Sequence, residues 1–337
     1  MSREVLISLT SVLVLVLVVG GVLVGSDQSA WSDHELIITA THIKKAPTGL
    51  DDRVWEKAPA VLIPMNGRES IDGKEETVFT RVVYTDDSIY FLFKWNDPTK
   101  SVTSRPWRFD GDKWIRLKGD EDRITLLFEA SRINQFATKG CVVACHGPGY
   151  EPKKEWTFAT KTAAEAGDLW DWRAVGSAPC ECAVDGWLTV AGYNGVYGAS
   201  KKTGLRIDAG KGGGFKNQTK NESKPLYMQD PAKKPSIPEV LLKEEAVKIT
   251  DYSIFKAGDV IPFICPMKFA GSRFDVRAVS HYAHGGWTVM LYRKLDTGHD
   301  NDVVFNPMKH YAFAMALFDD SVDDYSKAEA LSLYFSR

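Results

Sequence analysis

Two neighbouring segments that alternate with a period of two constrain the fold most strongly. β-branched side chains recur at every second position of Thr77–Tyr84, and apolar side chains do so along Ser88–Trp95. Asp86 and Asp87 lie between the segments, where a tight turn is needed. A period of two is the pattern of a strand with one buried face. The sequence therefore predicts a β-hairpin over residues 77–95.

Short apolar runs separated by turn residues continue through the rest of the chain. They are Val61–Ile63, Arg123–Phe128, Ile261–Cys265, Asp275–His281, Trp287–Tyr292, Phe305, Tyr311–Phe318 and Leu331–Phe335. No sustained helical periodicity competes with them, and the ten Trp residues suit an aromatic interior. These patterns predict an all-β sandwich with loop excursions.

One excursion is expected over residues 199–238, where Lys, Gly, Asn and Pro dominate without periodicity. We interpret it as a surface loop or partner-binding loop and not as a second domain. Gly210–Gly214 lacks the spacing of a phosphate-binding loop and its Lys-Ser/Thr ending. The formal net charge of −2, from 42 basic and 44 acidic residues, gives no support for nucleic-acid binding.

Cys141, Cys145 and His146 form a C-x-x-x-C-H pattern before a loop rich in Gly and Pro. Two thiols can add to the vinyl groups of a porphyrin, and the histidine that follows can bind the iron axially. The usual pattern has two residues between the cysteines, whereas this one has three. It predicts one covalent haem c, attached through Cys141 and Cys145, with His146 as an axial iron ligand.

The N-terminus predicts export, which agrees with covalent haem because thioethers form outside the cytoplasm. Val5–Gly25 is an apolar run of the length that spans a bilayer, with Arg3 before it. A cleaved signal is the alternative to an anchor, although the best cleavage site, near Ala30, is poor. We expect an anchor or signal segment over 1–26, a tether or leading strand over 27–48 and the sandwich over 49–337, in the periplasm or an equivalent compartment.

Two other functions are compatible with these residues. Cys141, Cys145 and His146 could hold zinc, or the cysteines could form a disulfide, in an interaction module. Alternatively, the tryptophans could form a stacking platform in an exported sandwich that binds a carbohydrate or another small ligand without covalent haem. No nucleophile elbow, H-E-x-x-H sequence or evident carboxylate pair is present. We therefore expect an electron carrier, with catalysis in a partner subunit.

Several segments together resemble a known family, the haem-binding gamma subunits of ethylbenzene dehydrogenase-type molybdenum enzymes. Ile89–Thr99 is similar to a hairpin with the pattern YLLFRWxDPT. The other segments occur in the family's order and are Gly140–His146, Asp168–Arg173, Gly271–Val276, Gly286–Val289, Tyr311–Ala314 and Phe318–Asp319. The resemblance covers the chain from about Leu50 to the C-terminus, outside the 199–238 excursion.

The resemblance implies an immunoglobulin-like or carbohydrate-binding-module-like sandwich that holds one haem beside iron–sulfur and molybdopterin subunits. Members with haem b use a Met and a Lys as iron ligands; His146 would replace the Met, and Lys327 corresponds to the Lys. The family's c-type members include nitrite-oxidoreductase-like cytochromes. Two departures leave the sixth ligand open: WHWK is replaced by Trp170–Arg173, and Cys180-Glu181-Cys182 is added.

Other side chains remain candidates for the sixth iron ligand. Cys180 and Cys182 would supply a soft thiolate and lower the reduction potential. Cys265 and Met267, on either side of Pro266, are further sulfur donors. His281, His284 and His310 are expected to be ordinary strand and turn residues.

Overall fold

The structure, a computed structural model, describes residues 36–66, 76–145, 158–192, 203–321, 325–328 and 330–336. The chain divides into two compact units, Met1–His34 and Glu35–Arg337, and all described residues belong to the second. Among the described residues, no helix is long and apolar enough to cross a membrane. The predicted anchor or signal segment at 1–26 lies outside them.

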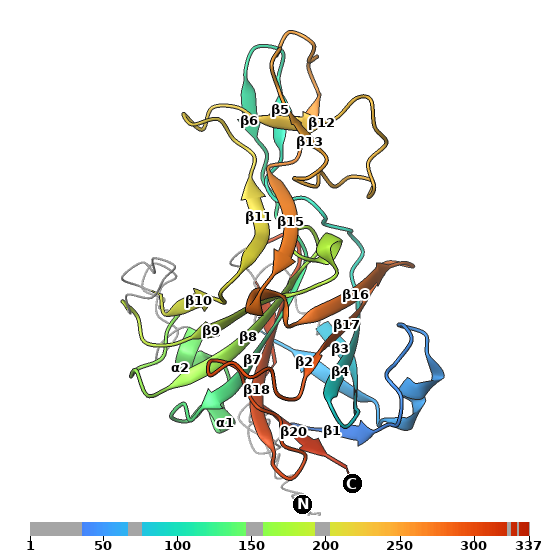
Figure 1. The fold of residues 1–337 in the computed structure, drawn as a ribbon, viewed down its shortest axis with the longest axis vertical. Coiled ribbons are helices and arrows are strands. Elements are labelled where there is room, and N and C mark those ends of the chain that lie inside the picture. The colour runs from blue at the N-terminus through green and yellow to red at the C-terminus, as the bar shows by residue number, and fades with distance from the viewer. Residues whose placement is uncertain are drawn as a thin grey trace, which may run out of the picture. The chain divides into compact units, whose positions relative to one another are not determined.

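Thirteen strands form one long sheet. In chain order they are β1 (Leu36–His42), β2 (Val61–Met65), β3 (Glu76–Tyr84), β4 (Ser88–Asn96), β7 (Arg123–Ser131), β8 (Ala166–Arg173), β9 (Val184–Leu188), β10 (Leu205–Ile207), β16 (Arg277–Tyr282), β17 (Gly286–Lys294), β18 (Tyr311–Phe318), β19 (Tyr325–Lys327) and β20 (Leu331–Phe335). Their order is β10-β9-β8-β7-β18-β20-β1-β3-β4-β17-β16, with β19 beside β18 and β2 beside β3 (Figure 1).

The sheet curls so that its two halves face each other across a shared core. Phe91 of β4 meets Trp170 of β8 edge to face, with ring centroids 5.7 Å apart. Trp172 of β8 meets Trp287 of β17 at 5.0 Å. All four side chains are at most 5% exposed. Contacts of this kind between the two halves confirm the predicted all-β sandwich.

The alternating segments form strands as predicted. The 77–95 hairpin is confirmed as β3 and β4, with Thr85 donating its backbone N–H to the carbonyl of Ser88 across the turn. The expected strands at 311–318 and 331–335 correspond to β18 and β20. Phe305 belongs to no strand but packs into the core beside Phe128. The pattern therefore identified a core residue there and assigned it the wrong local structure.

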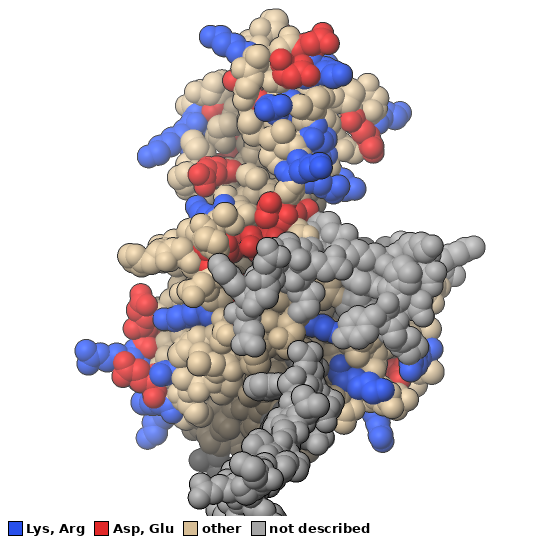
Figure 2. Space-filling view, turned by 180° about the vertical axis from the view of Figure 1, so that it is seen from behind, with Lys and Arg blue, Asp and Glu red and all other residues tan. Residues whose placement is uncertain are grey.

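A second group of strands forms what we call the arm, residues 104–119 and 211–270. Its strands are β5 (Trp107–Phe109), β6 (Trp114–Arg116), β11 (Lys211–Lys216), β12 (Tyr227–Gln229), β13 (Ala246–Lys248), β14 (Val260–Ile261) and β15 (Ile264–Ala270). β11 pairs with β15 as a stem (Figure 1). A separate cluster that includes Trp107, Trp114 and Phe263 forms an apolar core in the arm. Figure 2 shows Lys and Arg on the arm interspersed with Asp and Glu.

The arm corrects two predictions. Residues 199–238 were expected to be an aperiodic loop, but β10, β11 and β12 lie within them. The single strand expected at 261–265 is two strands, because β14 ends at Ile261 and β15 begins at Ile264. Pro262 lies between them, and a proline cannot donate a backbone hydrogen bond to a continuous ladder.

Helices are few and short in the described residues. They are α1 (Phe136–Lys139), α2 (Val142–Cys145) and the 3₁₀ turns η1 (Arg53–Lys57), η3 (Ala178–Cys180) and η4 (Ser272–Phe274). α1 and α2 follow one another after β7. They therefore carry the chain through the first half of the predicted haem segment.

Candidate functional site

A sharp change of direction separates α1 from α2. Gly140 ends α1 and donates its backbone N–H to the carbonyl of Phe136 at 2.8 Å. Its φ of 59° and ψ of −148° suit glycine, because a Cβ disfavours this conformation. Cys141 follows immediately, and its carbonyl accepts a hydrogen bond from Ala144 at 2.9 Å. The glycine thus sets where the predicted haem segment begins.

Cys141 lies against an apolar area of the outer sheet face, which we call the apolar patch. It is 6% exposed and belongs to a cluster with Leu127 of β7, Leu169 of β8 and Ala314 of β18. Ala144 of α2 is in the same cluster and is fully buried. The patch therefore brings three strands together with the start of the predicted haem segment.

The rest of the attachment pattern is described only in part. The backbone of Cys145 ends α2, and His146 lies outside the described residues. Positions four apart on an α-helix differ by about 40° around the axis, and positions three apart by about 60°. A helical backbone thus tolerates the longer spacing between positions 141 and 145.

Lys327 belongs to the same sheet face as the apolar patch. It lies opposite Ala316 across the β18–β19 ladder, and directly paired residues of a ladder share a face. Ala316 and Ala314 are two apart on β18, so they also share that face, separated by about 7 Å. Backbone hydrogen bonds of 2.8 Å in both directions join Lys327 to Asn66. The backbone around Lys327 is therefore hydrogen-bonded both to β18 and to Asn66.

A polar row borders the apolar patch. Ala316 pairs with Thr125 of β7, and Thr125 pairs with Asp171 of β8. Thr125 Oγ1 donates to Asp171 Oδ1 at 2.8 Å, and the other carboxylate oxygen of Asp171 lies 2.6 Å from Arg173 Nε. Lys327, Ala316, Thr125 and Asp171 thus lie side by side across four strands. Inward and outward positions alternate along β8, and this accounts for the Trp-Asp-Trp-Arg sequence of Trp170–Arg173. Its two tryptophans face the core and its two charged residues face outward.

Cys180 and Cys182 lie away from the apolar patch. They connect the end of β8 to the start of β9, whereas Cys141 packs near Leu188 at the other end of β9. Five residues of strand separate these ends by about 15 Å. Burial, with a contribution from Glu244, raises the pKa of the Cys180 thiol to about 11, and burial raises that of Cys182 as well. Cys180 Sγ donates to the carbonyl of Met267 at 3.3 Å.

Cys265 and Met267 lie in the stem of the arm. Cys265 of β15 pairs with Phe215 of β11 and is fully buried, and burial raises the pKa of its thiol to about 12. Met267 pairs with Gly213 on the same ladder. Of the proposed sixth ligands, Lys327 is therefore the one on the face that carries Cys141.

Two groups of carboxylates come together in the structure that no pattern in the sequence indicated. Oxygens of Asp168, Asp185 and Asp302 lie within 4.8 Å of one another, and so do those of Asp97, Asp122 and Asp319. Most of these residues are far apart in sequence, and only strand pairing brings them together. The signal that could have found them is an Asp at an inward position of a strand, as in β8 and β9.

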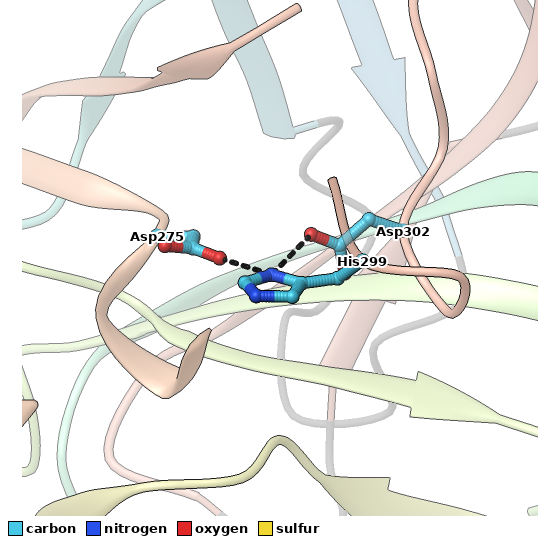
Figure 3. Close-up of side chains that lie close together, drawn as sticks. All are labelled: Asp275, His299 and Asp302. Atoms are coloured by element: carbon cyan, nitrogen blue, oxygen red, sulfur yellow. Dashed lines mark ion pairs between the residues drawn. The ribbon is translucent and has the colours of Figure 1, made fainter. Parts of the chain in front are cut away.

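The first of these groups contains buried charges of both signs. Asp168, Asp185 and Arg293 are at most 1% exposed, and Arg293 Nη1 lies 2.6 Å from Asp168 Oδ2 and 3.4 Å from Asp302 Oδ2. Burial, followed by the charge of Asp168, raises the pKa of Asp185 well above its usual range. At the edge of the group, His299 Nδ1 lies 2.8 Å from Asp275 Oδ2 and 3.9 Å from Asp302 Oδ2 (Figure 3).

Comparisons with solved structures give distant similarities. One is a candidate carbohydrate-binding protein from Bacteroides uniformis, at 6% identity and a TM-score of 0.37, covering 90% of this chain and 100% of that one. Another is a family 9 carbohydrate-binding module from Caldicellulosiruptor kristjanssonii in complex with cellotriose, at 8% identity and a TM-score of 0.36, covering 89% of this chain and 93% of that one. No curated protein matches the chain.

The family comparison is more extensive. A profile described as ethylbenzene dehydrogenase matches residues 52–330. The match includes β2 to β19, Cys141, the apolar patch and Lys327. It relates the chain to an oxidoreductase system. The chain belongs to the ethylbenzene dehydrogenase family.

Proposed function

We propose that this chain is a monohaem c-type cytochrome and the electron-transfer, gamma-type subunit of a respiratory molybdenum oxidoreductase complex, such as a nitrite-oxidoreductase-like enzyme. Molybdopterin and iron–sulfur subunits would be its partners, and catalysis would take place there. Family membership supports the association with an oxidoreductase. The C-x-x-x-C-H pattern and the apolar N-terminal run support covalent haem and export.

The observation that carries the proposal is the shared sheet face of Cys141 and Lys327. Cys141 belongs to the same apolar cluster as Ala314, and Lys327 pairs with Ala316, the next residue of β18 on that face. These positions come from segments almost 190 residues apart in the sequence. A thioether and a sixth iron ligand both need to reach one porphyrin, and a common face allows this.

The residues around Cys141 fit a porphyrin chemically. Leu127, Leu169 and Leu188 line the patch, and Ala312 and Ala314 are small enough to admit a flat group against the strands. The polar row next to the patch supplies Thr125 and Asp171. An apolar lining with polar groups at one edge is what an amphipathic, flat cofactor requires.

In this proposal, each residue has a separate task. Cys141 and Cys145 would hold the haem covalently, and His146 and Lys327 would supply ligands to its iron. The haem supplies one-electron redox chemistry, and the chain sets its potential through axial ligands, burial and hydrogen bonds.

The first test is a peroxidase-type haem stain after denaturing electrophoresis, together with the intact mass of the purified chain. Colour and added porphyrin mass should remain with the denatured chain. Cys141→Ala combined with Cys145→Ala should abolish both, whereas Cys265→Ala, in the stem of the arm, should preserve both. A colourless wild-type chain without added mass, produced in a host that matures c-type cytochromes, would overturn the proposal.

The sixth ligand is tested by Lys327→Ala. The variant should retain covalent haem but change from a six-coordinate low-spin to a high-spin visible spectrum. Lys139→Ala is the matched control, because Lys139 is exposed and lies two residues before Cys141. An unchanged spectrum in Lys327→Ala would exclude Lys327 as a ligand while leaving the covalent haem in place.

Carbohydrate binding without haem is the alternative function, and the tryptophans do not favour it. Of the eight tryptophans in the described residues, all but Trp187 are buried, with exposures of at most 9%. A stacking platform needs exposed rings. An oligosaccharide titration of a colourless chain would identify this outcome.

A further inference from the structure

The core of the sandwich contains a group of carboxylates that the electron-transfer function does not use. Asp168 and Asp185 lie on the inward faces of β8 and β9, and Asp302 enters from the loop after β17. Their exposures are 0%, 0% and 6%. Charges buried this deeply require partners.

Arg293 is one such partner, but it leaves most of the carboxylate oxygens unsatisfied. It contacts Asp168 Oδ2 and Asp302 Oδ2, and the backbone N–H of Val303 also donates to Asp168 Oδ2 at 2.9 Å. Thr297 donates to Asp302 Oδ2 at 2.6 Å. Both oxygens of Asp185, Asp168 Oδ1 and Asp302 Oδ1 are buried without any hydrogen-bond partner. Asp208, whose backbone N–H donates to the carbonyl of Asp185, leaves its Oδ2 unpartnered as well.

We propose that Asp168, Asp185 and Asp302 bind a divalent cation of the Ca²⁺ type inside the sandwich, with Asp208 as a neighbouring oxygen donor. One oxygen from each of the three lies within 4.8 Å of the others. Two oxygens bound to the same ion lie at most twice the Ca–O distance of about 2.4 Å apart, and all three spacings meet this condition. The three carboxylates and Arg293 carry a formal charge of −2, which a divalent ion balances.

The chemistry of the donors favours Ca²⁺ over other ions. Apart from Arg293 Nε, the unpartnered atoms of the group are carboxylate oxygens, which hard cations prefer, and Ca²⁺ accepts six to eight oxygen ligands. Mg²⁺ usually keeps several water molecules, and residues that are 0–6% exposed leave little room for them. The imidazole of His299 is engaged by Asp275 at the edge of the group (Figure 3).

The second carboxylate group provides a matched comparison. In Asp122, Oδ2 accepts hydrogen bonds from Ser101 and from the indole of Trp287, at 2.8 and 2.9 Å. In Asp97, Oδ1 accepts from Thr99, which leaves Oδ2 as the unpartnered atom. Hydrogen-bond donors thus satisfy more of this group, and we expect no tight cation binding there.

The test uses the full chain, stripped with a chelator and titrated with Ca²⁺ by calorimetry and thermal unfolding. Ca²⁺ should raise the melting temperature by several degrees and bind with a stoichiometry of one. Asp185→Asn should lose this response and be more stable than wild type in the chelator, because it removes an uncompensated buried charge. Asp97→Asn should keep the response. No calorimetric binding to the stripped wild type, or loss of the response in Asp97→Asn alone, would overturn the site.

Terbium luminescence keeps the proposal testable if Asp185→Asn does not fold. Tb³⁺ replaces Ca²⁺ at oxygen sites and emits when a nearby tryptophan is excited. Trp170 pairs directly with Asp185 and lies 4.9 Å from the Arg293 guanidinium. Trp170→Phe should therefore reduce the emission, whereas Trp114→Phe in the arm should leave it unchanged. Equal emission from all three chains would place the ion elsewhere.

Discussion

The side chain of Arg293 makes several buried polar and aromatic contacts in the core of the sandwich. It is 1% exposed, contacts Asp168 and Asp302, donates to the carbonyl of Val303 at 2.6 Å and lies beside the ring of Trp170. Its replacement by an uncharged residue leaves buried carboxylates without their positively charged partner. Breaking a buried ion pair in this way costs about 3–5 kcal/mol. Arg293→Met should therefore lower the free energy of unfolding by about this amount in urea titrations.

Lys294→Met is the control for that variant. Lys294 is the next residue of β17 and is exposed, so its replacement should change the unfolding free energy by less than about 0.5 kcal/mol. Equal effects of the two variants would show that the buried ion pairs do not stabilise the core.

Asp97 gives the fold a pH dependence of defined sign. Burial, and then the charge of Asp319, raises its pKa from 3.8 to about 6. Between these two values the folded chain holds a proton that the unfolded chain has released, so stability is lost as the pH rises through this range. Asp97→Asn removes the titration. It should be more stable than wild type at pH 7.5, by up to about 3 kcal/mol, and lose this advantage below about pH 4.

Urea midpoints at the two pH values measure this effect. Asp112→Asn is the control, because Asp112 is exposed and should give the same difference from wild type at both. A gain in Asp97→Asn that does not depend on pH would contradict the assigned cause.

At the scale of elements, Asn217 joins the strands of the arm. Its amide donates to the carbonyls of Tyr227 and Pro262, and its Oδ1 accepts from the N–H groups of Leu226 and Tyr227. Asn217 is fully buried, so Asn217→Ala leaves several backbone groups without partners. We expect a loss of about 2–4 kcal/mol, seen first as faster amide exchange in β12, β13 and β15.

Asn221→Ala is the control that tests whether this loss of stability comes from the buried hydrogen bonds of Asn217. Asn221 is exposed, and water can replace the partners of its side chain. Asn221→Ala should leave the exchange rates of the arm within error of wild type. Uniform acceleration across β3 and β4 in Asn217→Ala would instead mean that the arm and the sandwich unfold as one unit.

Strand prediction worked where one face of a strand is buried and the other is not. β3, β4, β18 and β20 were found because their apolar periodicity is local information. β11 was missed because KGGGFK offers few side chains for a pattern, and its strand conformation depends on pairing with β15. β8 was missed because its inward Asp168 interrupts the apolar face, and that carboxylate is tolerated only because Arg293, 125 residues later, lies against it.

The residues of the candidate site also divide into those that local sequence indicates and those that only the fold brings together. The spacing of Cys141, Cys145 and His146 can be read from the sequence, because attachment to one porphyrin needs neighbouring residues. Lys327 came from a resemblance, since nothing in its local sequence marks it as a ligand. Only the pairing register of β18 and β19 shows that Lys327 lies on the sheet face that carries Cys141. The carboxylate group around Asp185 has no local signal and appears only when β8 and β9 are paired.

For the whole molecule, the decisive strand is β20. β20 lies between β18 and β1 and pairs in parallel with β1, so it joins the two halves of the sheet. Leu331 and Leu333 are at most 1% exposed. A chain ending at residue 330 would lose both ladders and part of the core. It should be insoluble or fail to give the sharp thermal transition of wild type.

Leu333→Ala provides a graded version of this test. It keeps both ladders but removes a buried side chain, so it should fold with a loss of about 2–5 kcal/mol. A soluble, cooperatively unfolding chain that ends at residue 330 would show that β20 is dispensable.

This placement of β20 also governs when the protein can acquire its final form during biosynthesis. Since almost 300 residues separate β1 from its neighbour β20, the ladder between them cannot form until Leu331–Phe335 has been synthesised. The apolar patch beside Cys141 consists of residues from β7, β8, β9 and β18, which all precede β20, so this surface can form before the sandwich closes.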